Sequence, residues 1–248
     1  DVAGELERWG FNEQCLQIRK FRFNESVLQL EGEAVVRKLL AAPTVREWLK
    51  LAEEDVVVTR LKTSATSMEL FSPLERSDVE GAVCAPGGSL RQCEHLEIQD
   101  AAVHDVLRRR LVRLELQTKV DGSPADDDPQ DVGDYEDDDT DDRRGLPDDR
   151  DEFLFHLFAL LAIGGPLAQH DFELAPYLDA TKALYRSLVT VYKATKTKKV
   201  TVSTQAFRVF GANLFPSANK LQRCYVLFDP KSNAATLLYH SRKLTAFW

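Results

Sequence analysis

The stretch that decides the fold is DEFLFHLFALLAIGGPLAQHDFELAPYLDATKALYRSLVTVYK, residues 151–193. From Phe153 to Ile163 every residue except His156 is apolar, so this segment has no polar face. A helix that is apolar all round is surrounded by protein. Its eleven residues are too few to cross a bilayer. The sequence therefore predicts a helix buried at the centre of the molecule.

A second helix is predicted to follow the first after a short joint. Gly164 and Gly165 supply a left-handed helix end, and Pro166 prevents the helix from continuing. The second helix is expected to begin near Pro176, because proline is tolerated at a first helical position. Its predicted buried side carries Tyr177, Thr181, Leu184, Leu188 and Val191. Lys182, Arg186 and Lys193 fall on the opposite side, which predicts a basic outer face.

Charge is strongly segregated along the chain. The net charge is −8, but residues 121–151 hold 15 acidic and 3 basic residues, whereas residues 182–248 hold 12 basic and 1 acidic residue. Such opposed regions influence association rates and the choice of partner. Residues 121–150 are also poor in aromatic residues and rich in aspartate, glycine and proline. They cannot bury enough apolar surface to order themselves, so we predict a disordered acidic insert.

The predicted fold class is α+β, with the helix pair packed against a small antiparallel sheet. In the sheet, Cys224–Phe228 is expected to be the central strand and Thr236–His240 the returning strand. The N-terminal half is expected to be mixed, with strands in residues 16–23 and 56–61 and two short helices divided by Pro43. The predicted parts are residues 1–120, 121–150 and 151–248, and the sequence leaves open whether the two outer parts share one core.

Two segments of the N-terminal half have their own predictions. Residues 63–98 contain several prolines and glycines and are expected to form loops, with one helix around residues 67–70. Residues 101–117, AAVHDVLRRRLVRLELQ, are expected to form one helix capped by Asp100. The predicted outward-facing residues of this helix are Arg108, Arg109, Arg110 and Arg113.

The sequence carries no recognisable catalytic or cofactor-binding motif. The sequence has no 18-residue apolar run and no apolar N-terminal signal region, so we expect a soluble, non-secreted protein. The four cysteines are scattered, which favours reduced structural thiols. A zinc site can be assembled on paper from Cys84, Cys93, His95 and His104, but the close cysteine spacing of zinc sites is missing. A calcium-binding loop starting at Asp134 is not expected, because its sixth position is Asp139 instead of glycine and its twelfth is Gly145 instead of glutamate. We expect no catalytic residue, metal or cofactor, and we interpret His156 as a hydrogen-bonded core histidine.

The basic face remains the one candidate binding site. The candidate residues are Lys182, Arg186, Lys193, Lys196, Lys198 and Lys199. A solvated surface, an acidic protein partner and a nucleic acid are three interpretations of this face, since basic patches also bind phosphates. A further hypothesis is that the acidic insert folds back over these residues until a partner displaces it.

Several segments resemble a known family. The runs DEFLFHLF, GGPLAQ, APYLDATKALYRSLVTVYK and TKKVTVSTQAFRV resemble the cilia- and flagella-associated protein 300 family, and the likeness continues through YVLFDP and LLYH. ERWGF and FRFNESV resemble its N-terminal half, whereas residues 120–150 look like an acidic expansion. The first residues of the family's chain have no counterpart here, so Asp1 is not expected to be the natural start.

The resemblance implies a non-enzymatic factor for the assembly and ciliary transport of outer and inner axonemal dynein arms. The implied partners are axonemal dynein subunits, cytoplasmic dynein assembly factors and the intraflagellar transport machinery. The implied locations are the cytoplasm and the axoneme of motile cilia or flagella, and no membrane, nucleic acid or small-molecule substrate is expected. The alternative that the residues leave open is a module that binds nucleic acid or another acidic polymer through the basic C-terminal third.

Overall fold

The computed structural model describes residues 2–23, 30–49, 56–99, 101–118, 144–165, 171–195, 198–211, 214–215 and 219–242. These residues mix helices with antiparallel strands, so the predicted α+β class is confirmed. In chain order the elements are α1 (Val2–Arg8), β1 (Leu16–Arg22), α2 (Gly32–Ala41), α3 (Pro43–Leu49), β2 (Val57–Leu61), η1 (Glu69–Phe71), α4 (Ser72–Glu75), β3 (Gln92–Ile98), β4 (Ala101–Asp105), α5 (Val106–Gln117), α6 (Phe153–Ile163), α7 (Ala175–Leu188), β5 (Val191–Lys193), β6 (Val200–Val202), β7 (Gln205–Phe210), β8 (Arg223–Asp229) and β9 (Ala234–His240).

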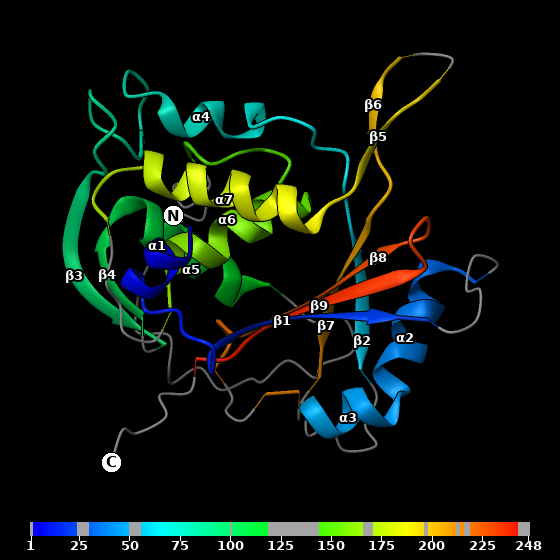
Figure 1. Ribbon diagram of the computed structural model, residues 1–248. Helices are drawn as coiled ribbons and strands as arrows, with labels where there is room; N and C mark the ends of the chain where they lie inside the picture. Colours follow the sequence, from blue (N-terminus) through cyan, green and yellow to red (C-terminus); the bar gives the residue numbers. More distant parts are fainter. Residues whose placement is uncertain are drawn as a thin grey trace.

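A five-stranded antiparallel sheet forms the middle of the molecule, with the strand order β1-β9-β8-β7-β2. The predicted C-terminal meander is its centre, and β8 is the central strand as expected. Both edge strands come from the N-terminal half: β1 pairs with β9, and β2 pairs with β7. The first and last strands of the chain therefore lie side by side (Figure 1).

Helices cover both faces of this sheet (Figure 1). In β8, Tyr225 and Leu227 pack on the side of α6 and α7, while Val226 and Phe228 pack with the residues of α2 and α3. Side chains alternate between the two faces of a strand, so a strand that is covered on both faces is apolar at every position. This explains why the sequence of β8 shows no alternation.

Helix α6 is the buried helix that the sequence predicts. Ten of its eleven residues are buried and apolar, and only His156 is partly accessible. The helix ends at Gly164, whose nitrogen donates to the Leu160 oxygen at 3.2 Å and whose φ of 79° suits glycine. Its ψ of 178° lies outside the left-handed helical conformation that the sequence predicts for this end. Gly165 then donates to the Trp9 oxygen at 2.9 Å. A Cβ on Gly165 would lie 2.2 Å from the Gly10 oxygen, so only glycine permits this contact.

The predicted helix over residues 101–117 is wrong in its first third. Residues 101–105 form β4, which pairs with β3, and the helix begins only at Val106. Asp105 caps it by accepting a hydrogen bond from the Arg108 nitrogen at 2.9 Å, whereas Asp100 lies outside the described residues. The burial of residues 101–105 alternates with a period of two, as in a half-covered strand, and pairing with β3 decides between strand and helix. The expectation of loops between residues 63 and 98 correspondingly missed β3.

The prediction that the arginines of α5 point mostly outward is wrong for Arg108 and Arg110, which are both buried. Arg108 forms an ion pair with Asp105, and its Nε donates to the Ala162 oxygen at 2.8 Å. The last carbonyls of a helix lack intrahelical donors, so Arg108 satisfies the end of α6. Its guanidinium also bonds the Tyr177 hydroxyl, and Tyr177 stacks on Trp9 at 4.4 Å. Arg108 thus links α5 to α6 and α7, and the stacking of Tyr177 on Trp9 extends this link to the residue that follows α1.

A second buried polar cluster lies between α5, α6 and the sheet. Arg208 Nη2 donates to a Glu115 oxygen at 2.8 Å, and Arg223 Nη2 lies 3.4 Å from the other oxygen. Burial alone would raise the pKa of Glu115, but Arg223 and Arg208 outweigh burial and lower it to about 2. His156 Nδ1 and the Tyr225 hydroxyl are hydrogen-bonded at 3.4 Å, as expected for a core histidine. Burial, followed by the charge of Arg208, lowers the pKa of His156 to about 3.

Most of the predicted acidic insert lies outside the described residues, which resume at residue 144. Of its last residues, Leu146 is buried in the main hydrophobic core. Within the described ranges, no helix has the length and apolar character needed to span a membrane.

Candidate docking surface

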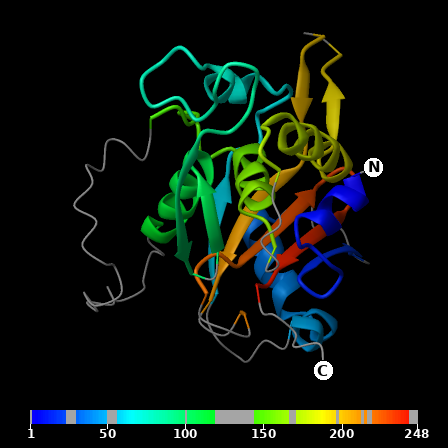
Figure 2. The ribbon, with the colours of Figure 1, turned by 90° about the vertical axis from the view of Figure 1, so that its left-hand side faces the viewer.

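The most prominent surface feature is a hairpin of β5 and β6, which we call the arm (residues 191–195 and 198–202). Its strands pair antiparallel, with Val191 opposite Val202 and Lys193 opposite Val200, and form a sheet of their own. The arm follows α7 directly and projects beyond the body of the molecule in two perpendicular views (Figures 1 and 2). A projecting hairpin is accessible to a partner from more than one side.

The root of the arm is held by one carboxylate. Asp229, at the end of β8, accepts hydrogen bonds from Thr190 Oγ1 at 3.4 Å and from Ser203 Oγ at 3.3 Å. Thr190 precedes β5 and Ser203 follows β6, so both strands are tied to the same side chain. The Ser203 nitrogen also donates to the Thr190 oxygen at 2.9 Å, and the Thr190 nitrogen donates to Thr204 Oγ1 at 2.9 Å. These bonds fix the direction in which the arm leaves the sheet.

The arm exposes large apolar side chains as well as charge. Val191, Tyr192 and Val200 are 51%, 39% and 45% exposed. The Lys231 ammonium lies 3.3 Å from the centre of the Tyr192 ring, so the β8–β9 turn supports this ring through a cation–π contact. Exposed apolar side chains that gather on one small element are typical of interaction sites.

The structure divides the predicted basic face between a helix and the arm. Lys182 and Arg186 are exposed on α7, Lys193 is exposed on β5, and Lys198 and Lys199 are exposed just before β6. Lys196 lies outside the described residues. The prediction that one helix continues to residue 193 is wrong, because α7 ends at Leu188. The β-branched run of Val189, Thr190 and Val191 favours extended backbone over helix.

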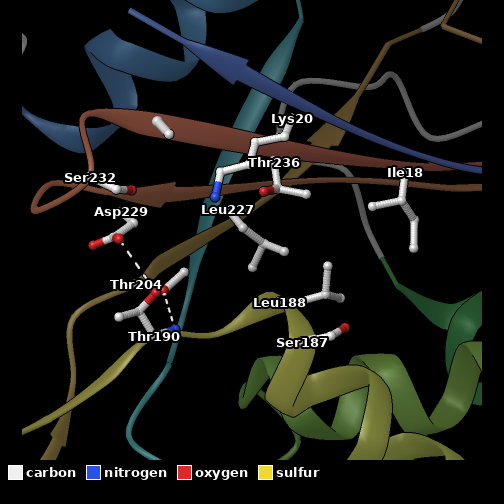
Figure 3. A pocket seen from close by; sticks show the side chains of 11 residues that line it. Ile18, Lys20, Ser187, Leu188, Thr190, Thr204, Leu227, Asp229, Ser232 and Thr236 are labelled. Carbon is white, nitrogen blue, oxygen red and sulfur yellow. Dashed lines mark hydrogen bonds between the residues drawn. The ribbon is translucent and has the colours of Figure 1, made fainter.

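A pocket of about 270 Å³ opens at the root of the arm. Figure 3 shows Ile18 and Lys20 entering it from β1, with Ser187 and Leu188 on the side of α7. Thr190, Thr204 and Asp229 belong both to this pocket and to the root of the arm, so the two features are continuous. The pocket therefore offers apolar, hydroxyl and cationic groups beside the arm, together with the carboxylate of Asp229.

Sequence reasoning missed the arm and its anchor. The runs VTVY (189–192) and VTV (200–202) are β-branched and flank the lysine-rich segment between them, which is a hairpin signal that was available. The role of Asp229 carries no such signal, because nothing local to a turn residue indicates partners 39 and 26 positions earlier in the chain.

The candidate zinc ligands do not assemble into one site. His95 and His104 lie on adjacent strands with their Nδ1 atoms 3.1 Å apart and their rings stacked. In the part of the chain that the structure describes, no three histidine, cysteine, aspartate or glutamate side chains gather as metal ligands. All four cysteines are free thiols, as predicted, and Cys15, Cys84 and Cys224 are buried. The calcium loop considered at Asp134 lies outside the described residues.

These observations define an α+β protein whose distinguishing surface is a basic and apolar arm. The family model described as "Cilia- and flagella-associated protein 300" matches residues 1–118 and 145–240. The chain belongs to this family. The match covers both edge strands, the helix pair and the arm, and leaves out the acidic expansion.

Two curated relatives carry the family's name. The chain is 23% identical to "Cilia- and flagella-associated protein 300" of Chlamydomonas reinhardtii over 97% of its length and 91% of that protein. It is 22% identical to the protein of the same name in Paramecium tetraurelia, over 94% of its length and 84% of that protein. No solved structure matches the chain.

Proposed function

We propose that this chain is a cilium- and flagellum-associated factor that acts by binding other proteins and not by catalysis. More specifically, it serves the assembly and ciliary transport of outer and inner axonemal dynein arms. It binds axonemal dynein subunits, cytoplasmic dynein assembly factors and the intraflagellar transport machinery, in the cytoplasm and at the axoneme.

Membership of the family is the observation that carries this proposal, because it associates the chain with cilia and flagella. The arm adds a physical reason for a binding role. It presents Lys193, Lys198 and Lys199 together with exposed apolar side chains on an element that projects from the body. Interfaces combine apolar anchors with charges that steer and orient the partner.

The test is to replace Lys182, Arg186 and Lys193 by glutamate and to purify the protein with its partners from the cytoplasm of ciliated cells. We expect dynein heavy or intermediate chains to co-purify with the unaltered protein and to be reduced about tenfold or more with the triple variant, as for loss of steering charges. Folding should survive, because all three side chains are exposed. A thermal unfolding curve checks this.

A matched control replaces three exposed basic residues elsewhere, Arg60, Arg76 and Lys220, by glutamate. This control has the same change in net charge, and it should retain the dynein chains. If no dynein chain co-purifies with the unaltered protein, and the protein instead shifts RNA or DNA at physiological salt, the proposal is wrong. In that case the basic C-terminal third binds nucleic acid.

A further inference from the structure

We infer that the arm and the pocket at its root form one docking site for an acidic protein segment that carries a large apolar side chain. The inference rests on the proposed function, because it names the kind of segment that such a binding factor would hold. Three features of the described residues carry it: the composition of one face of the arm, the lack of acidic residues in the strands of the arm, and the lining of the pocket.

The first feature is the face of the arm. Side chains alternate along a strand, and the register places Val191, Lys193, Val200 and Val202 on one face, with Tyr192 and Thr201 on the other. Val191 and Val200 belong to different strands and are both about half exposed. Val202 is partly buried and packs against the main core at the root of the arm. This face is therefore an apolar strip that leads from the core out to a lysine.

The second feature is the charge around this strip. No aspartate or glutamate stands between Asp179 and Asp229 in the sequence, so the arm supplies no acid of its own. Asp229 is directed to the root, where the Thr190 and Ser203 hydroxyls bond it. Lys193 and Lys198 remain exposed. A partner that covers the strip must place its own charges near these ammonium groups, and acidic side chains are the ones that this field attracts.

The third feature is the pocket. A volume of about 270 Å³ suits one or two side chains and lies just below the usual range for small-molecule sites. Ile18 and Leu188 supply apolar walls, and Lys20 supplies a cation at the same opening (Figure 3). The carboxylate of Asp229 also lines the pocket, but it accepts hydrogen bonds from the Thr190 and Ser203 hydroxyls. This lining accepts an apolar side chain whose neighbour in the bound segment is acidic.

Rigidity at the root strengthens the site. Several hydrogen bonds join Thr190, Ser203, Thr204 and Asp229, and the Tyr192 ring rests against Lys231. A surface that is ordered before binding loses less conformational entropy when a partner docks. The arm can therefore hold an extended segment between its apolar face and the pocket.

The experiment measures fluorescence anisotropy of labelled probes with the purified full chain. The first probe is a short peptide that alternates glutamate with leucine. The second replaces each leucine by serine, the third replaces each glutamate by glutamine, and the fourth is a single-stranded RNA. We expect saturable binding of the first probe and at least about tenfold weaker binding of the other three, since a tenfold change corresponds to the loss of only one good contact.

Two variants locate the site. Replacing Val191 and Val200 together by serine should weaken binding of the first probe about tenfold, and Lys193→Glu should weaken it by a similar factor. The matched controls are Phe172→Ser, at an apolar side chain that is 56% exposed away from the arm, and Lys220→Glu. Both controls should bind the first probe as the unaltered chain does.

A measurement without variants guards against effects on folding. On the unaltered chain, the first probe should slow amide hydrogen exchange in the arm and leave exchange in β3 and β4 unchanged. Equal binding of the glutamine or RNA probe, equal losses in the controls, or unchanged exchange in the arm would each overturn the inference. If the serine variant still retrieves dynein chains from cytoplasm, the proposed function stands and only the docking site is wrong.

Discussion

At the scale of single residues, Glu115 is a structural residue that pairs with two buried arginines. Its carboxylate is the shared partner of Arg208 and Arg223, and all three side chains are buried. Removing one member of a buried ion cluster leaves the others charged and unpaired, which costs about 3–5 kcal/mol. Glu115 therefore allows two strands of the sheet to carry arginines toward the core.

We predict that Glu115→Gln lowers the free energy of unfolding at neutral pH by about 3–5 kcal/mol. It should also change the response to acid. The folded pKa of about 2 lies below the ordinary value of 4.5, so the unfolded state binds the proton first. The stabilisation from Glu115 is complete above pH 4.5 and is lost as the pH falls toward 2.

Urea unfolding measured at a series of pH values checks this prediction. The loss of stability between pH 4.5 and 2 should be shallower in the variant than in the unaltered protein. Glu69→Gln, at an exposed position, should leave both the stability and its pH dependence unchanged. An equally steep acid transition in Glu115→Gln would show that the carboxylate is not paired as described.

Gly165 gives a second residue-scale prediction. Gly165→Ala places a Cβ 2.2 Å from the Gly10 oxygen, and backbone on both sides cannot move without separating α6 from the end of α1. We expect a loss of more than about 2 kcal/mol, in the range of overpacked cores. Gly211→Ala is the control, because its nearest neighbour is a Val56 methyl group at 3.3 Å, which can shift. Thermal unfolding of the two variants should separate them clearly.

At the scale of elements, the arm depends on a side chain from another strand. We predict that Asp229→Ala increases amide hydrogen exchange in β5 and β6 about tenfold or more, because the opening of a local segment costs less once its anchoring bonds are removed. The melting temperature should change little, since the arm lies outside the five-stranded sheet. Asp179→Ala, at an exposed position on α7, serves as the control. Unchanged exchange in the arm would mean that the backbone bonds alone hold its root.

Elements with a strong local pattern were predictable from the sequence. Helix α6 has no polar face, β8 is apolar throughout, and Pro43 separates α2 from α3 as expected. The errors occur where a local pattern fits two structures. Residues 101–105 fit a strand or a helix, and residues 189–193 fit the end of a helix or the start of a hairpin. In both places the decision comes from pairing with the neighbouring strand of a hairpin, β3 for β4 and β6 for β5, which the pattern of one segment taken alone does not contain.

The candidate site was predictable in its residues and not in its shape. The exposure of Lys182, Arg186 and Lys193 follows from their position opposite the apolar side of the sequence pattern. Their division between α7 and the arm depends on where the helix ends, and the anchoring by Asp229 depends on the packing of β8 against the root. Similarly, the inward direction of Arg108 results from its pairing with Asp105 and the end of α6.

At the scale of the whole molecule, both halves of the sequence contribute side chains to the same two hydrophobic clusters. The main cluster includes Trp9 and Leu107 together with Phe158 and Tyr225, and the second cluster joins Val36 to Val226. The boundary at residue 151 therefore divides the sequence, whereas the packing of the two clusters extends across it. A fragment that begins there lacks β1, β2 and the helices that cover one face of the sheet.

We predict that residues 151–248 alone show no cooperative unfolding transition, because the apolar side chains of α6 and β8 would be exposed to water. Co-expression with residues 1–118 should restore a folded complex, since the missing edge strands and helices are then supplied. Calorimetry of the fragment and of the complex provides the measurement. A sharp transition in the fragment alone would indicate that it folds independently.

The pairing of β1 with β9 also constrains how the protein is made. Leu16 pairs with His240, so β1 leaves the ribosome early but cannot pair until β9 has been synthesised. At typical synthesis rates of roughly 5–20 residues per second this delay lasts on the order of tens of seconds. During that time an incomplete edge with apolar side chains is open to wrong contacts, and such long-range pairing is intrinsically slow. A nascent chain with this topology therefore exposes an unpaired strand edge until its last strand has been synthesised.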